Sequence, residues 1–273
     1  MKIPIPKTIF GAPIAGARER AKEMHKNKTP TGSEDQPPQT FPKNITLSDY
    51  LQVPNVVGIH GKPVIISKFE IQEANNLNYN GAHEFALKQG LYVPTPSIFM
   101  PHFNNVISTY KNKQPLLDGE GNPIPREEHE DIYKHLTTNH KVVYAGGREG
   151  AWTWLNARFV EGTGFNNLDL ETITGLLSDG NFQTIKSPLQ ITLNEDTYAE
   201  LSFNPQGLPI SKSKVQKYKQ GDNFYFWKPV LNRVARFYAG SGRARLNCSR
   251  DPSIRNASLG VFGCAEGTDV QKI

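Results

Sequence analysis

An alternation of small apolar and polar residues from Arg243 to Ser249 constrains this chain more than any other feature. Ala244, Leu246 and Cys248 fall on one side of an extended segment. The residues between them, which fall on the other side, are Arg243, Arg245, Asn247 and Ser249. A strand with one buried face has this period of two, and Asp251-Pro252 ends it because proline cannot donate to a ladder. The alternation predicts either a sheet with a contact-making face or an ordinary strand with a solvated face.

Contact-type side chains recur through the whole stretch from Asp222 to Cys264. Arg, Tyr, Trp and Asn are enriched at binding hot spots and in adaptable binding surfaces. We therefore expect ligand-contacting positions here. They are Tyr225, Trp227, Leu231, Arg233, Phe237, Tyr238, Arg245, Asn247, Ser249, Arg250, Ile254, Arg255 and Ser258.

Short motifs in the same region carry a family resemblance. They are Val234-Ala235-Arg236-Phe237, Gly242-Arg243-Ala244, Asp251-Pro252-Ser253, Arg255-Asn256-Ala257-Ser258-Leu259-Gly260-Val261 and Cys264-Ala265-Glu266-Gly267. In this order they resemble the C-terminal end of C-type-lectin-like domains of the formylglycine-generating-enzyme type, and within that group the variable proteins of diversity-generating retroelements. The resemblance implies an α+β fold in which two helices flank a mixed, mostly antiparallel sheet with long irregular loops.

The same resemblance implies a function. In such families a reverse transcriptase rewrites codons of the terminal repeat at template adenines, and the fold displays the rewritten residues as a ligand-binding surface. The positions above would then contact a protein or other macromolecular ligand, and the chain would not be an enzyme. Two rivals stay open: a lectin-like structural protein with a fixed ligand, such as a viral tip protein or adhesin, and a divergent thiol enzyme.

The domain organisation follows from composition. Residues 1–46 are expected to form an appendage, with a basic, possibly helical run at 15–28 and a Pro-rich linker at 29–44. The basic run reads as a solvated arm, with contact to phosphates, a membrane surface or a partner as alternatives. Residues 47–273 are expected to form the lectin-like domain, with an insert at about 162–220 and the variable region at about 222–264.

The first half of the domain predicts a hairpin and two helices. Strands are expected at 56–59 and 64–69, and an amphipathic helix runs from Tyr79 until Gly90 stops it. The turn at 91–96, Leu-Tyr-Val-Pro-Thr-Pro, leads to a second helix capped by Thr95 or Ser97. Its predicted core stripe is Phe99, Phe103, Val106, Ile107 and Tyr110. This order resembles the first half of the same lectin-like fold.

The middle of the chain offers candidate metal ligands on a charged helix expected at 127–140. Its candidates are His129, Asp131 and His135, but the spacing from His129 to His135 does not suit one helix face, so a solvated face is the favoured interpretation. Strands are expected at 142–144 and 151–159, the latter with Trp152 or Trp154 packed in the core. The glycine-rich segment 146–150 lacks the context of a phosphate-binding motif and is expected to be a loop.

The region before the tail is expected to hold a helix at 167–177, strands at 190–193 and 198–202, and a basic loop or helix at 211–220. Leu170, Ile173, Thr174 and Leu177 would share one face of that helix.

Composition sets limits on partners and chemistry. The chain has 273 residues, 37% hydrophobic, with a net charge of +5, which is too mild for a dedicated nucleic-acid binder. Calcium-binding lectin motifs and a nucleophile elbow are missing, so we expect no cofactor, no metal and no catalytic residue. Cys248 and Cys264 are expected to be free and buried, with a bridge as the alternative. With neither a signal peptide nor a membrane span in the sequence, a cytoplasmic or virion-associated location is expected.

Overall fold

The computed structural model describes residues 8–9, 12–13, 45–59, 61–142, 148–240 and 242–266. The chain divides into two compact units, Met1–Gln39 and Thr40–Ile273. In the first unit, β1 (Thr8–Ile9) pairs antiparallel with β2 (Ala12–Pro13). The basic run and the Pro-rich linker expected at 15–44 lie outside the described residues.

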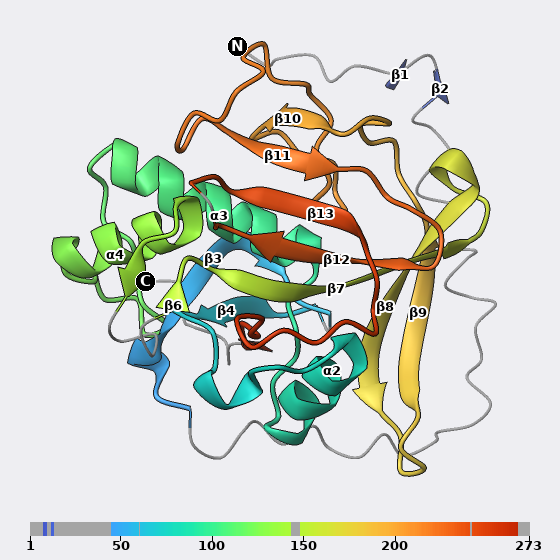
Figure 1. The fold of residues 1–273 in the computed structure, drawn as a ribbon, viewed down its shortest axis with the longest axis horizontal. Helices are drawn as coiled ribbons and strands as arrows, with labels where there is room; N and C mark the ends of the chain where they lie inside the picture. The colour runs from blue at the N-terminus through green and yellow to red at the C-terminus, as the bar shows by residue number, and fades with distance from the viewer. Residues whose placement is uncertain are drawn as a thin grey trace. The chain divides into compact units, whose positions relative to one another are not determined.

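A seven-stranded sheet dominates the second unit (Figure 1). Its spatial order is β10-β11-β13-β12-β7-β8-β9, and only β11 and β13 pair in parallel. The strands are β7 (Trp152–Glu161), β8 (Leu168–Leu176), β9 (Phe182–Pro188), β10 (Thr197–Glu200), β11 (Asn223–Trp227), β12 (Arg233–Tyr238) and β13 (Arg245–Arg250). The segment expected as an insert therefore contributes β8, β9 and β10 to the sheet that holds the C-terminal strands.

A smaller sheet joins the beginning of the second unit to its end. β3 (Tyr50–Val57) and β4 (Pro63–Ser67) form a hairpin, and β14 (Cys264–Glu266) pairs antiparallel with β4. β5 (Lys141–Val142) and β6 (Arg148–Glu149) form a separate two-stranded ladder. Short 3-10 turns lie at Leu47–Asp49, Gln72–Ala74 and Phe165–Asn167.

The described residues form three α-helices: α2 (Tyr79–Lys88), α3 (Pro96–Lys111) and α4 (Arg126–Thr137). The Asn78 side chain caps α2 by accepting a hydrogen bond from the Gly81 N–H at 2.8 Å. Helix α3 covers one face of the large sheet, where Phe99 and Phe103 approach the Phe237 ring with centroid distances of 4.8 and 5.1 Å. In Figure 1, α3 runs behind β13 and β12.

The α+β class is confirmed, with mixed, mostly antiparallel sheets. Both early helices, the tryptophan-bearing strand and the strand near Tyr198 are also present where the sequence predicts them. The hairpin is present too, but its first strand, expected at 56–59, is β3 at Tyr50–Val57. None of the helices in the described part of the chain is long and apolar enough to cross a membrane.

Three predictions of secondary structure are wrong. The segment expected as a loop at 146–150 contains β6, which pairs with β5, while residues 146 and 147 lie outside the described ranges. The expected helix at 167–177 is strand β8, in which Leu168, Leu170 and Thr172 are buried while the alternate residues are partly exposed. Its apolar residues fit both periods, and pairing with β7 and β9 decides for the strand. The expected strand at 190–193 is irregular, because after Pro188 this segment bonds instead to the Pro209 carbonyl.

The solvated interpretation of α4 is also wrong. His129 and His135 are buried, and Asp131 is half-buried. His135 Nε2 lies 2.8 Å from Glu70 Oε2, and Glu70 Oε1 accepts the Trp152 N–H at 2.7 Å. A helix that looks charged in sequence is therefore docked by a buried carboxylate–imidazole pair to the start of β7.

Candidate functional site

The candidate site is the side of the large sheet that faces away from α3. Strand pairing places Tyr198, Tyr225, Arg245, Tyr238 and Trp152 in one row across five strands, β10 to β7. Their neighbours along each strand, such as Phe224, Leu246 and Phe237, point to the opposite side and are fully buried. We define the aromatic–arginine face as this row and the side chains around it. It comprises Trp152, Tyr198, Tyr225, Trp227, Arg236, Tyr238, Arg243, Arg245, Asn247 and Arg250.

Guanidinium groups and aromatic rings alternate across this face. The Arg245 guanidinium lies 4.8 Å from the Tyr238 ring centroid and 5.9 Å from that of Trp227. Arg243 lies 5.2 Å from the Tyr225 ring and donates a hydrogen bond to the Tyr198 hydroxyl at 3.0 Å. Cation–π contacts of this kind hold long side chains in defined positions on an open surface.

The rings also contact one another. The Tyr225 ring meets Tyr198 at 5.0 Å and Trp227 at 4.8 Å, both edge-to-face. Trp152 lies 4.6 Å from the Tyr238 ring. These contacts give the face rigid aromatic anchors, which have few rotatable bonds and present large areas for binding.

The face carries positive charge, and no carboxylate in the described part of the chain pairs with it. Among the described residues, none of Arg236, Arg245 and Arg250 forms an ion pair. Burial, together with the like charges of Arg250 and Arg245, lowers the pKa of Arg236 to about 10. Burial also lowers the pKa of Arg245, assisted by Arg243. The neighbouring Arg233 differs, because it pairs with Asp251 at 2.5 Å.

Helix α2 and the C-terminal segment cover the part of this side around Trp154. Trp154, next to Arg236 across β12 and β7, is fully buried, and its Nε1 donates to the Leu77 carbonyl at 3.0 Å. The Tyr79 ring of α2 lies 5.9 Å from it, edge-to-face. Gly260 of the C-terminal segment donates to the Trp152 carbonyl at 2.7 Å. The aromatic–arginine face lies on the strands from β10 to β12 and the edge at Trp152, while Thr184 and Lys186 of β9 are exposed on the same side, beyond the covered part.

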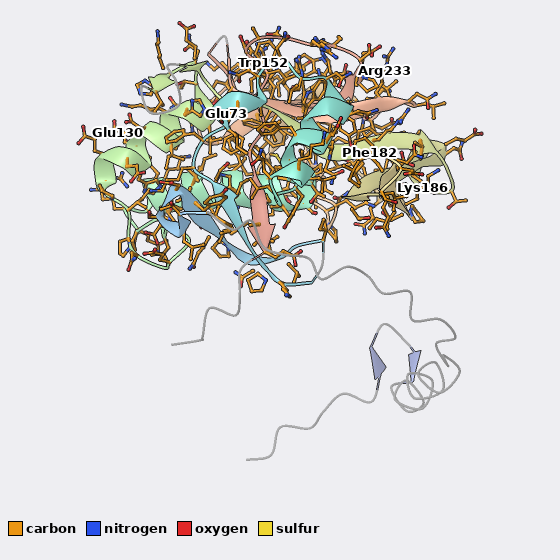
Figure 2. The ribbon with its side chains drawn as sticks, turned by 90° about the horizontal axis from the view of Figure 1, so that it is seen from below. Glu73, Glu130, Trp152, Phe182, Lys186 and Arg233 are labelled. Carbon is orange, nitrogen blue, oxygen red and sulfur yellow. The ribbon has the colours of Figure 1, made fainter. Side chains whose placement is uncertain are left out.

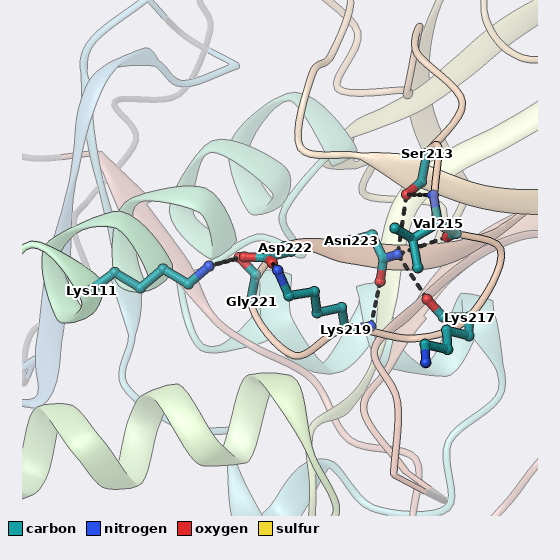
Figure 3. Close-up of polar contacts among 8 residues, drawn as sticks. All are labelled: Lys111, Ser213, Val215, Lys217, Lys219, Gly221, Asp222 and Asn223. Carbon is teal, nitrogen blue, oxygen red and sulfur yellow. Dashed lines mark hydrogen bonds and ion pairs between the residues drawn. The ribbon is translucent and has the colours of Figure 1, made fainter.

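The loop before β11 is held by a buried amide (Figure 3). Asn223 Nδ2 donates to Ser213 Oγ and to the Val215 and Lys217 carbonyls, at 3.2, 3.2 and 3.0 Å, and its Oδ1 accepts the Lys219 N–H at 2.8 Å. Beside it, Asp222 pairs with Lys111 and Lys219. The basic segment expected at 211–220 is thus a loop tied to the start of β11.

Most predicted contact positions lie on or beside this face. Tyr225, Trp227, Tyr238 and Arg245 belong to its row or flank it, and Ser249 and Arg250 end β13. Leu231 is exposed in the turn before β12, and Arg233 lies at the start of that strand. Ile254, Arg255 and Ser258 lie apart from the row, in the irregular segment after β13. Figure 2 places Trp152 and Arg233 along the same margin of the domain.

Two predicted positions need revision. Phe237 is wrong as a contact residue, because it is fully buried against Phe99 and Phe103 on the α3 side. Asn247 is on the expected side but only 9% exposed, and its Oδ1 accepts from the N–H and hydroxyl of Ser249. Its local hydrogen bonds shape the end of the strand.

The sequence prediction missed four residues of the face. Arg236 and Tyr238 share one side of β12 and Phe237 lies on the other, so alternation along this strand favours Arg236 over Phe237 as a contact position. The sequence does carry a signal for two of the others: Arg243 is one of the polar residues of the alternation at 243–249, and Tyr198 belongs to the strand expected at 198–202. Trp152 had no signal of its own, since only the covering of Trp154 distinguishes the two tryptophans.

Other candidate sites are weaker. A cavity of about 180 Å³ is lined by Tyr79, Asn80, Arg158, Glu171, Ile173, Phe182 and Thr184. This volume is below the ~300 Å³ at which typical small-molecule sites begin. Within the described ranges, no three His, Cys, Asp or Glu residues are arranged to hold a metal ion. Cys248 and Cys264 are free and buried, as expected.

Comparison with protein-family models, with curated proteins and with solved structures finds no match for this chain.

Proposed function

We propose that this chain is a ligand-binding protein whose C-terminal strands display a diversified surface on a C-type-lectin-like scaffold, like the variable proteins of diversity-generating retroelements. The observation that carries the proposal is the division of β13 and its neighbours into two sides. Ala244, Leu246 and Cys248 are fully buried, while Arg245 and Ser249 reach the surface. The buried residues thus hold the backbone of the strand in place, and the outward residues are the ones that can contact a ligand.

This division suits repeated sequence change. Substitution of surface residues usually alters the free energy of unfolding by about 0.5 kcal/mol or less, whereas truncation in a core costs several times more. Residues of the face on β11, β12 and β13 can then be replaced while the layer of Phe224, Phe226, Leu246 and Phe237 holds the strands on α3. A ligand surface could change in this way without loss of the fold.

The thiol-enzyme alternative finds little support. Cys248 and Cys264 lie on strands of different sheets, and burial raises the pKa of both thiols well above the ordinary value. The thiolate is the nucleophile in thiol chemistry, and reactive cysteines occupy partly exposed, electropositive surroundings. In the fixed-ligand alternative the same surface binds the ligand, but no retroelement rewrites the codons of its contact residues.

The coding DNA tests the proposal directly. We expect a reverse-transcriptase gene near a close copy of the codons for residues 224–262, with mismatches at adenines of the copy. A matched protein experiment randomises Tyr225, Trp227, Tyr238 and Arg245 in one library and Phe224, Phe226, Leu246 and Phe237 in another.

The first library should retain mostly folded, protease-resistant members and the second few. If the two libraries lose folded members equally, the diversified-scaffold proposal is refuted. If the libraries differ but no template copy exists, the fixed-ligand alternative replaces it.

A further inference from the structure

Four arginines of the aromatic–arginine face lie close together, and none of them forms an ion pair with a carboxylate of the described residues. Arg236 of β12 and Arg245 of β13 point to the same side of the sheet. They lie diagonally across the two strands, because Arg236 pairs with Asn247 and Tyr238 pairs with Arg245. Arg243 precedes β13, and Arg250 ends it. Arg250 acts on Arg236 as a like charge, and Arg243 acts on Arg245 in the same way.

The most buried member of this group is the most informative. Arg236 is only 9% exposed, and its Nε and Nη1 have no hydrogen-bond partner among the residues that the structure describes. The Nε atoms of Arg245 and Arg250 are buried and unpartnered as well. A buried guanidinium without a counter-ion is costly to the folded state, and an arriving anion would remove that cost.

Aromatic rings hold the guanidinium groups but cannot neutralise them. Arg236 lies 5.1 Å from the Trp152 ring centroid and 5.9 Å from that of Tyr238. The rings hold the guanidinium groups in place, so that little side-chain entropy would be lost when an oxyanion binds. A planar guanidinium can donate two parallel N–H hydrogen bonds to the two oxygens of one carboxylate.

The same contacts disfavour stacking of nucleic-acid bases. The Arg245 and Arg236 guanidinium groups already contact the Tyr238 ring, and the Arg243 guanidinium contacts the Tyr225 ring. The Tyr225 ring also meets Tyr198 edge-to-face. Single-stranded nucleic acids are bound chiefly by stacking of bases on open ring faces. The net charge of +5 is also modest for a phosphate-tracking surface.

We propose that the aromatic–arginine face binds an acidic protein segment, whose side-chain carboxylates pair with Arg236, Arg245 and Arg250. This inference rests on the proposed function and specifies its ligand class. The rings of Trp152, Tyr238 and Trp227 supply apolar contact around the carboxylates, and the guanidinium groups set the charge requirement.

The test uses the full chain and a short fluorescein-labelled poly-glutamate peptide, with poly-glutamine and oligothymidylate as comparison probes, followed by fluorescence anisotropy at low and moderate salt. The wild-type chain should bind poly-glutamate, should bind poly-glutamine much more weakly, and should lose affinity as salt rises. The double variant Arg245→Gln/Arg250→Gln should bind about tenfold more weakly or worse, because each partly desolvated charge pair contributes on that scale.

The matched control is Lys113→Gln/Lys141→Gln, which removes the same charge at exposed residues outside the face; its affinity should stay within about twofold of the wild type. Arg245→Lys, which keeps the charge but loses the fork, should be intermediate and guards against a folding defect in the double variant.

Absence of poly-glutamate binding to the wild type would overturn the proposal, and so would equal weakening in the arginine and lysine variants. Tighter binding of oligothymidylate that depends on Arg245 and Arg250 would overturn it too and assign the face to nucleic acid. These results leave the library experiment unaffected, so a wrong ligand class can be told apart from a wrong proposed function.

Discussion

Two adjacent residues of β13 give the sharpest prediction about this scaffold. Leu246 is fully buried and lies between Phe226 of β11 and Phe237 of β12 in the register of the sheet. Leu246→Ala removes most of a core side chain and leaves a cavity that flanking aromatic rings cannot readily fill. We expect a loss of about 3 kcal/mol in the free energy of unfolding, within the 2–5 kcal/mol typical of such truncations.

Arg245→Ala should behave differently although it is the next residue. It removes cation–π contacts with Tyr238 and Trp227, worth about 0.5–1 kcal/mol at an exposed site, and relieves repulsion from Arg243. We expect a net change below about 1 kcal/mol. The gap between the two variants is then about 2 kcal/mol or more, which corresponds to a factor of about 30 in the folding equilibrium.

Urea unfolding followed by circular dichroism measures both values without relying on Trp227 fluorescence, which the Arg245 substitution would itself disturb. Arg255→Ala, at an exposed position of the irregular segment after β13, serves as the near-zero control. If Arg245→Ala costs as much as Leu246→Ala, the outward residues are part of the framework, and the separation of scaffold from contact surface is refuted.

Three further predictions concern the supports of the face. The pKa of Glu70 is raised by burial, but the His135 charge and hydrogen bond and the Trp152 N–H lower it more, to a net value below the ordinary 4.5. This carboxylate therefore stabilises the fold above its unfolded pKa, and the contribution disappears as pH falls through the folded value. Glu70→Gln should cost about 3 kcal/mol at pH 7 in urea unfolding, and the gap to the wild type should narrow below about pH 4; a gap independent of pH would contradict the ion pair. Asn223→Ala should cost about 3 kcal/mol and loosen the loop before β11, which limited proteolysis at the loop lysines would detect; unchanged cleavage would show that the amide does not hold the loop. Iodoacetamide should leave Cys248 and Cys264 unmodified in the native protein and label both in urea, as read by mass spectrometry, whereas rapid native labelling would reopen the thiol-enzyme alternative.

Local periodicity was sufficient to predict several elements of this fold. The alternation around Ala244, Leu246 and Cys248 survives as the buried side of β13, and the helical stripe at Phe99 and Phe103 packs where an amphipathic helix should. Such patterns are decided by nearest neighbours in the chain, because a buried face imposes its period on whatever element carries it.

Features that depend on which strands become neighbours could not be predicted. Leu168 to Leu176 fits a helix or a strand by pattern, and pairing with β7 and β9 selects the strand. The buried state of His135 depends on Glu70, which is 65 positions away in the chain. Neither period nor composition carries information about partners at such separations.

The candidate site shows the same division. The sequence by itself determined that contact-type side chains recur between buried ones near the C-terminus, because alternation is a local property. Only the tertiary structure decided that Tyr198, Arg236 and Trp152 join them while Phe237 does not, because strand order, the register shift between β12 and β13 and the covering by α2 set which side chains reach the surface. That Arg236 is buried with no ion-pair partner in the described ranges is likewise a property of its neighbours in space.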